Sequence, residues 1–143
     1  MGWNNSHLHS FQFGKRVFSS RPAELEDLNM LDEGRYTLEA VLDDSLSEFV
    51  YDYDFGDSWR HLIQPKLVSK PNTEWFYPLC IAGERAAPPD DVGGIQGYLE
   101  FLKAIGNPKH PEHEDMLIWI GGAFDPEGFD LNAINRTLRF GSP

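Results

Sequence analysis

Two stretches of the sequence alternate between apolar and polar positions, which is the period of a β-strand with one buried face. The first is His7–Phe13, and a short partner strand is expected at Arg16–Phe18. The second runs from Glu48 to Val68 and is interrupted at Gly56, a residue that tolerates the positive φ a tight turn can need. The pattern therefore predicts a strand and a central β-hairpin in an antiparallel sheet.

Helical spacing of apolar residues dominates the second half of the chain. Helices are expected over Gly97–Ile105, Pro111–Ile120 and Leu131–Arg139. Asp130 is placed to cap the last of these, and Thr37 to cap a shorter helix over Leu38–Leu42. A chain in which the strands come first and the helices last is typical of the α+β class. We therefore expect a single domain over residues 1–143, in which C-terminal helices cover the antiparallel sheet.

Three further stretches are assigned by their composition. Ser19–Asn29 is polar and contains a proline, so it is expected to be a loop. Trp75–Cys80 is largely apolar and is expected to extend or cover the sheet. Ile81–Gly94 is a long loop rich in glycine and proline. Loops of this length inside a compact domain often carry function.

Composition narrows the class of protein. Of the 143 residues, 41% are hydrophobic and 13% aromatic, which is typical of a folded domain with a real core. The net charge of −11 repels phosphate backbones and disfavours direct binding to nucleic acid. The one cysteine suits a reducing compartment, and neither a signal-peptide pattern nor a membrane-spanning apolar run is evident. We expect a cytoplasmic protein with no membrane partner.

The hairpin carries four residues that could hold a divalent metal or act as a general base: Asp52, Asp54, Asp57 and His61. Asp52 and Asp54 are expected on the same face of one strand, with Asp57 at the turn and His61 on the returning strand. Two alternatives stay open. Acidic residues keep an open sheet face soluble, and Asp57 could simply accept turn N–H groups.

A second candidate is the pair His7 and His9. Residues two apart on a strand share a face, so both imidazoles could bind one metal ion. The favoured alternative is a half-buried strand that uses histidine as an ordinary polar aromatic residue.

The long loop contributes the remaining candidates. Arg85 could pair with Asp90 or Asp91, or bind an anionic ligand bidentately. Asp91 precedes two glycines, whose bare N–H groups could reach a ligand; equally, Asp91 could only cap the following helix. Asp90, beside Asp91, and Tyr98, at the start of that helix, complete the ligand-binding candidates. Cys80 could be a nucleophile, but a small buried hydrophobe is the favoured interpretation.

The hairpin segment YDYDFGDSWRH, residues 51–61, closely resembles the signature of the plasmid pRiA4b ORF-3-like family, also described as TnpR-type passenger proteins of insertion elements. Three other stretches match its pattern: NSHLHSF at 5–11, CIAGERAAPPDDVGGIQGY at 80–98, and HPEH at 110–113 with FDPE at 124–127. The resemblance covers nearly the whole chain. It implies an association with plasmids and mobile elements and leaves the activity open.

The same resemblance implies that an upstream strand and helix usually precede the stretch Met1–Trp3. The chain is therefore expected to be N-terminally shortened and to leave the strand His7–Phe13 at an exposed sheet edge. Exposed edges pair with other chains, so we expect either a two-fold homodimer or a natural product that starts further upstream. The alternative is that the loop Ser19–Asn29 covers the edge.

Three functions follow from these candidates. The leading hypothesis is a small binding or accessory domain that takes a small ligand or a peptide in a polar cleft between the hairpin 50–63 and the loop 80–98. The second is a divalent-metal-dependent hydrolase that uses the Asp/His cluster of the hairpin. The third is a structural protein-interaction module whose polar residues only brace loops.

Overall fold

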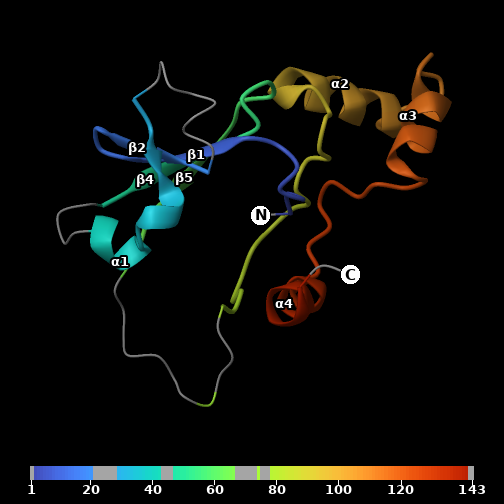
Figure 1. The fold of residues 1–143 in the computed structure, drawn as a ribbon. Helices are drawn as coiled ribbons and strands as arrows, with labels where there is room; N and C mark the ends of the chain where they lie inside the picture. The colour runs from blue at the N-terminus through green and yellow to red at the C-terminus, as the bar shows by residue number, and fades with distance from the viewer. Residues whose placement is uncertain (1, 21–28, 43–46, 67–73, 75–77, 142–143) are drawn as a thin grey trace. The chain divides into compact units, whose positions relative to one another are not determined.

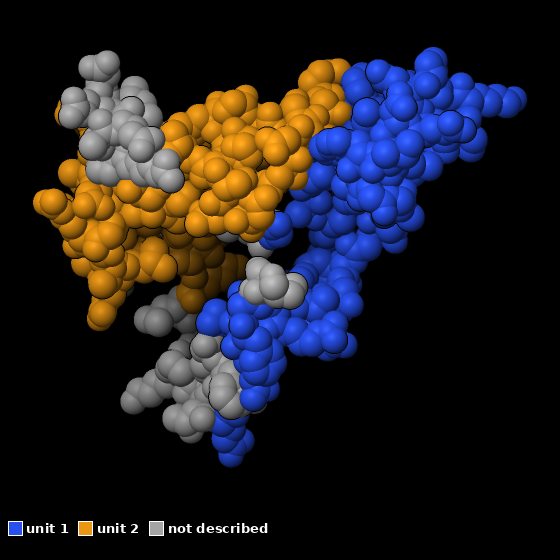
Figure 2. Space-filling view, turned by 45° about the vertical axis from the view of Figure 1, so that its right-hand side comes forward, with its two compact units in different colours: residues 1–2, 67–89, 100–143 blue, residues 3–66, 90–99 orange. Residues whose placement is uncertain are grey.

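The computed structural model describes residues 2–20, 29–42, 47–66, 74 and 78–141. The chain divides into two compact units (Figure 2). Unit 1 comprises Met1–Gly2, Leu67–Pro89 and Glu100–Pro143, and unit 2 comprises Trp3–Lys66 and Asp90–Leu99. The expectation of a single domain over residues 1–143 stays a prediction.

Unit 2 contains a five-stranded sheet in the order β3-β2-β1-β4-β5 (Figure 1). The strands are β1 His9–Phe13, β2 Arg16–Ser19, β3 Leu31–Asp32, β4 Phe49–Tyr53 and β5 Trp59–Ile63. The α+β class and the β4–β5 hairpin are confirmed. The expectation of a wholly antiparallel sheet is wrong, because β3 pairs with β2 in parallel. A strand of two residues is too short to show a period in the sequence.

One face of the sheet is almost continuously aromatic. The register places Phe11 opposite both Phe18 and Tyr51, so alternate residues of β1, β2 and β4 point the same way. Phe13 stacks on Phe49 at 4.4 Å between ring centroids, and Phe11 lies 4.8 Å from Tyr51. This face holds the buried core of unit 2.

The short helix α1, Leu38–Val41, contributes Val41 to that core. Thr37 caps it as predicted, since its Oγ1 accepts a hydrogen bond from the Ala40 N–H at 3.3 Å.

The strand β1 is not at an edge of the sheet. It pairs with β2 on one side and with β4 on the other, so the expectation that His7–Phe13 forms an exposed edge is wrong. In the described sheet the outermost strands are β3 and β5. Homodimerisation through a sheet edge stays a prediction, and it now requires one of these two strands.

Three helices follow the sheet in sequence: α2 Gly94–Gly106, α3 His113–Ile120 and α4 Leu131–Phe140. All three were predicted, with ends that differ by a few residues. Asp130 caps α4 as expected, with its Oδ1 accepting from the Ala133 N–H at 2.9 Å. The packing of the C-terminal helices on the sheet stays a prediction. Across the described residues, no helix is both long enough and apolar enough to cross a membrane.

Within unit 1, buried Phe101 of α2 contacts the rings of Trp119 and Phe124. The backbone of Cys80 exchanges two hydrogen bonds with the side chain of Asn135, at 2.8 and 2.9 Å. These contacts hold the segment around Cys80 against α4. Residues 75–77 of the expected apolar run lie outside the described residues, and residues 78–80 form no strand.

Candidate metal centre

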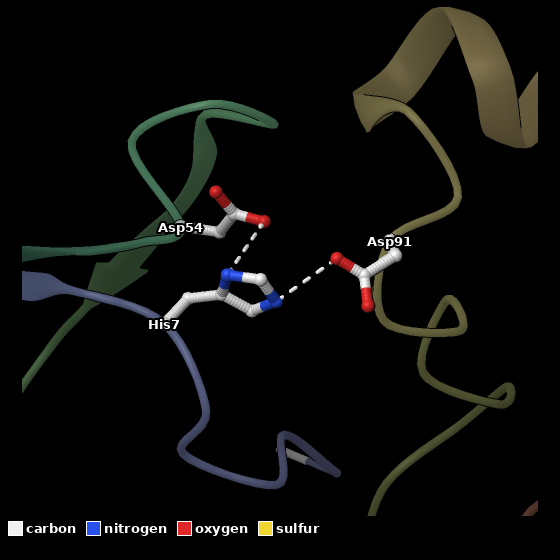
Figure 3. A group of neighbouring side chains, drawn as sticks. All are labelled: His7, Asp54 and Asp91. Atoms are coloured by element: carbon white, nitrogen blue, oxygen red, sulfur yellow. Dashed lines mark ion pairs between the residues drawn. The ribbon is translucent and has the colours of Figure 1, made fainter.

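A histidine lies between two aspartates in unit 2 (Figure 3). The distance from His7 Nδ1 to Asp54 Oδ2 is 3.7 Å, and that from His7 Nε2 to Asp91 Oδ1 is 3.1 Å. One ligand atom from each of the three residues lies within 4.8 Å of the other two. The second contact is short but lacks hydrogen-bond geometry, so buried Nε2 has an ionic neighbour without a directional bond.

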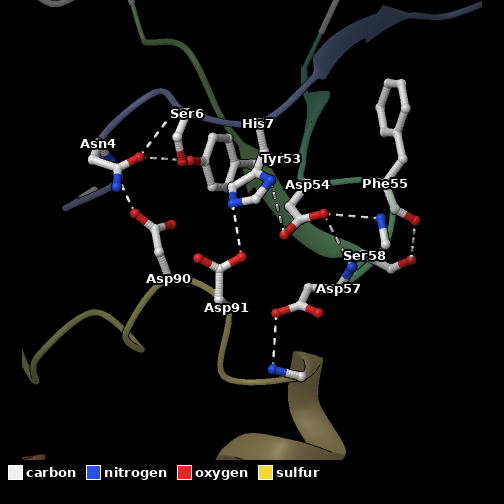
Figure 4. A network of polar contacts seen from close by, with 12 residues as sticks. Asn4, Ser6, His7, Tyr53, Asp54, Phe55, Asp57, Ser58, Asp90 and Asp91 are labelled. Atoms are coloured by element: carbon white, nitrogen blue, oxygen red, sulfur yellow. Dashed lines mark hydrogen bonds and ion pairs between the residues drawn. The ribbon is translucent and has the colours of Figure 1, made fainter. Parts of the chain in front are cut away.

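Asp54 is fixed by its own turn. It follows the last residue of β4 with a φ of 55°, and its N–H donates to the Leu8 carbonyl at 2.9 Å. Its Oδ1 accepts from the N–H groups of Gly56 and Asp57, at 2.9 and 3.2 Å. Aspartate commonly holds turns in this way and tolerates the left-handed region. One carboxylate oxygen therefore holds the hairpin turn, and the other faces His7 (Figure 4).

Asp57 joins the hairpin to the start of α2. Its Oδ2 accepts from the Gly93 N–H at 3.0 Å. Gly94 has a φ of 66°, and a Cβ there would lie 2.6 Å from the Asp57 carbonyl oxygen. Only glycine fits this approach without a shift. This close packing holds the start of α2 beside the hairpin, and with it Asp91, which lies three residues before Gly94.

The N-terminal segment is held over the same region. Asn4 donates its N–H to Asp90 Oδ2 at 3.4 Å and accepts at Oδ1 from the Tyr53 hydroxyl at 3.3 Å (Figure 4). The Trp3 ring stacks on Tyr53 at 4.7 Å. These contacts position His7 from its N-terminal side.

Non-glycine residues with positive φ are concentrated in the same segments. Four of the described non-glycine residues with positive φ lie there: Asn5, Asp54, Ser58 and Asp91. Such conformations cost about 1–3 kcal/mol each and cluster at functional sites. The positive φ that the hairpin turn requires thus falls on Asp54 and Ser58, whereas the sequence suggested Gly56.

The structure does not bring the four hairpin candidates together. Asp52 makes a bidentate pair with Arg60, at 2.9 and 3.1 Å, and this carboxylate raises the pKa of the guanidinium. Asp52 and Asp54 do not share a strand face as expected, because the left-handed conformation of Asp54 turns the chain away after Tyr53.

His61 has partners at both ring nitrogens. The Trp3 indole N–H donates to Nε2 at 3.1 Å, so the ring proton lies on Nδ1, which donates to the Tyr51 carbonyl at 3.1 Å. In this arrangement the imidazole is neutral and positions the Trp3 ring. The pKa of the neighbouring Tyr51 hydroxyl is raised by burial and then by the charges of Tyr53 and Glu33.

The remaining candidates, His9, Arg85 and Tyr98, each contact residues outside the group of His7, Asp54 and Asp91. His7 and His9 line one cavity but have different partners, since His9 Nε2 lies 3.1 Å from Glu33 Oε1. Their joint binding of one metal ion stays a prediction. Arg85 pairs with Glu127 at 3.2 Å, where an aspartate partner was expected. The Tyr98 ring lies 6.3 Å from the Trp59 ring.

The expected cleft between the hairpin and the whole loop 80–98 stays a prediction. Only the part of the loop from Asp90 onward belongs to the same unit as the hairpin. Sequence reasoning named His7, Asp54 and Asp91 separately and did not group them, and it missed Glu33. These groupings depend on contacts between distant segments, such as that of Asp57 with Gly93, for which the sequence carries no local signal.

The fold and this site together define a small α+β protein with an imidazole–dicarboxylate centre beside a hairpin turn. The chain belongs to the plasmid pRiA4b ORF-3-like protein family, whose model matches residues 1–133. It is 35% identical over 141 residues to the uncharacterized protein y4hQ of Sinorhizobium fredii (strain NBRC 101917 / NGR234), a match that covers 96% of this chain and 71% of that protein.

A solved structure supports the fold. The chain is similar to the crystal structure of the protein of unknown function MM3350 from Methanosarcina mazei Go1, with a TM-score of 0.78 and 32% identity. The match covers 93% of this chain and 75% of that one. The relatives carry no stated activity, so function must be argued from the site.

Proposed function

We propose that this protein is a small binding domain whose functional centre takes a divalent cation on His7, Asp54 and Asp91. The observation that carries the proposal is the set of three donor atoms within 4.8 Å of one another. Metal–ligand bonds of about 2.0–2.2 Å place neighbouring ligand atoms roughly 3–3.6 Å apart. The three donors need to move by about 1 Å. Because Asp54 faces Nδ1 of His7 and Asp91 faces Nε2, one carboxylate must also turn toward the ring nitrogen that binds the ion.

The donor set favours a particular group of ions. One imidazole and two carboxylates suit Zn²⁺, Mn²⁺ or Fe²⁺ better than Ca²⁺, which prefers oxygen ligands alone. The Asp54 side chain is 12% exposed and fixed by its turn, whereas that of Asp91 is 71% exposed. Asp54 and His7 thus form the fixed part of the centre, and Asp91 closes on the ion.

A metal-dependent hydrolase is the second candidate. Three protein ligands leave coordination positions for a water molecule and a substrate, as in catalytic zinc sites. The competing explanation is a structural role, in which Asp54 and Asp91 brace His7 by charge alone. The two differ in a measurable way, because bracing needs no metal.

The test is a calorimetric titration of chelator-treated protein with Zn²⁺, Mn²⁺, Mg²⁺ and Ca²⁺. One ion per chain is expected, with Zn²⁺ or Mn²⁺ preferred. Asp54→Asn should weaken binding by about 100-fold or more, beyond the roughly 10–100-fold typical of outer-shell partners. Asp52→Asn is the matched control, since it removes the same charge from a residue that pairs with Arg60.

Equal losses in the two variants would indicate a non-specific effect of negative charge and would overturn the proposal, as would the absence of stoichiometric binding. Release of product from simple ester or phosphodiester substrates by the metal-loaded protein, lost in Asp54→Asn, would favour the hydrolase.

A further inference from the structure

A groove lies within unit 1, between helix α4 and the segment around Leu79. Its volume is about 630 Å³, which is within the range of small-molecule sites. The two hydrogen bonds between the Asn135 side chain and the Cys80 backbone, at 2.8 and 2.9 Å, join its two walls. The groove is therefore formed by segments that contact each other directly.

The α4 side of the groove is basic, in a chain whose net charge is −11. The helix contains Arg136 and Arg139 and no acidic residue. Both arginines and Asn132 line the groove, at a spacing that places them on one face of the helix. Among the described residues, Arg136 has no hydrogen-bond or ion-pair partner, so its N–H groups can reach a ligand. Arg139 has contacts of its own, one of them with the Phe140 ring, and contributes charge.

The groove also has an apolar side. Leu79 and Phe140 line it and are 38% and 75% exposed. A ligand with an apolar body removes part of this surface from water, which is favourable. An inorganic anion leaves both side chains in water, so the lining favours an organic anion.

The charge of the surroundings limits the charge of the ligand. Glu74 also lines the groove, is exposed and has an interaction of its own. Its carboxylate and the net charge of −11 repel a second negative charge. A carboxylate carries a single charge, whereas a phosphate monoester carries about −1.5 to −2 at pH 7. The groove therefore favours a carboxylate.

We infer that this groove binds a small organic carboxylate with an apolar body. Arg136 donates two parallel N–H groups to the carboxylate, a geometry that the planar guanidinium fits. Arg139 adds positive charge, and the apolar body contacts Leu79 and Phe140. The inference does not depend on a metal at His7, because the groove shares no residue with that centre.

The test compares four probes on the ¹⁵N-labelled full chain at constant ionic strength, after metal and chelator have been removed. Benzoate has a ring and a carboxylate, benzyl alcohol has the ring alone, acetate has the carboxylate alone, and phenyl phosphate has the ring with a higher charge. Benzoate should shift the side-chain N–H signals of Arg136 and Asn132 saturably at millimolar concentration, and the other three should bind more weakly. Equal or tighter binding of any of those three, or no saturable response to benzoate, would overturn the inference.

Two variants locate the site. Arg136→Gln should weaken benzoate by roughly tenfold or more, the effect of losing charged hydrogen bonds. Arg136 is exposed, so this substitution should leave the fold intact. Arg35→Gln is the control, because it removes the same charge from a residue outside the groove that pairs with Asp32. Equal affinity for benzoate in the two variants would contradict the assignment to Arg136.

Discussion

Asp54 has two tasks that substitutions can separate. Its Oδ1 holds the hairpin turn through the N–H groups of Gly56 and Asp57, and its Oδ2 faces His7. Asparagine keeps one carbonyl oxygen for the turn and replaces the other oxygen by an NH₂ group, which cannot bind a cation. Alanine removes both. Asp54→Asn should therefore lose the metal and keep the stability of the fold, whereas Asp54→Ala should lose the metal and also destabilise the fold.

The magnitude follows from the contacts. Hydrogen bonds to a charged acceptor contribute about 1.5–3 kcal/mol, and here one oxygen serves two donors. Alanine also tolerates a φ of 55° less well than aspartate, which adds about 1 kcal/mol. Asp54→Ala should thus lower the free energy of unfolding by about 2–4 kcal/mol, and the melting temperature by roughly 5–15 °C. Asp54→Asn should change the free energy by less than about 1 kcal/mol.

Urea denaturation in the presence of a chelator measures both variants without any contribution from bound metal. Two results would refute the reasoning. If Asp54→Ala and Asp54→Asn are equally stable, Oδ1 does not hold the turn. If Asp54→Asn retains full metal affinity, Oδ2 is not a ligand.

Three further predictions test the surroundings of the centre. Gly94→Ala should lower both stability and metal affinity, since its Cβ would meet the Asp57 carbonyl oxygen at 2.6 Å; unchanged melting and binding curves would contradict the close approach. The raised pKa of Tyr51 favours the neutral hydroxyl in the folded state, so stability is complete below the ordinary value of 10.0 and falls as the pH rises through the higher folded value. Tyr51→Phe should flatten that alkaline loss in denaturation curves, and an identical slope would argue against it. Arg85→Ala should change the free energy of unfolding by less than about 1 kcal/mol, because both partners of the Arg85–Glu127 pair are more than two-thirds exposed; a larger loss by chemical denaturation would assign the pair a structural role.

The sequence alone predicted those strands and helix ends that depend on residues close together in the chain. The alternation of apolar residues around Tyr51 and Tyr53 gave the hairpin, and Thr37 and Asp130 gave the caps of their helices. The strand β3 was missed because its two residues are held by a parallel neighbour. Parallel pairing between separate segments produces no periodic pattern of apolar residues in a strand this short.

The candidate centre could be predicted only in part, for a related reason. A shared face for Asp52 and Asp54 follows from the period of a strand, but the left-handed conformation of Asp54 ends that period after Tyr53. The contact between Asp57 and Gly93 joins segments far apart in the sequence. The residue types were therefore predictable, and their grouping was not.

The most direct test of the central claim is an anomalous-difference map from crystals of the protein equilibrated with Mn²⁺ or Zn²⁺. The account predicts one strong peak about 2.0–2.3 Å from a ring nitrogen of His7 and from carboxylate oxygens of Asp54 and Asp91. A fully soaked crystal without a peak among these three residues, or with its strongest peak at Asp52 or His61, would contradict the account.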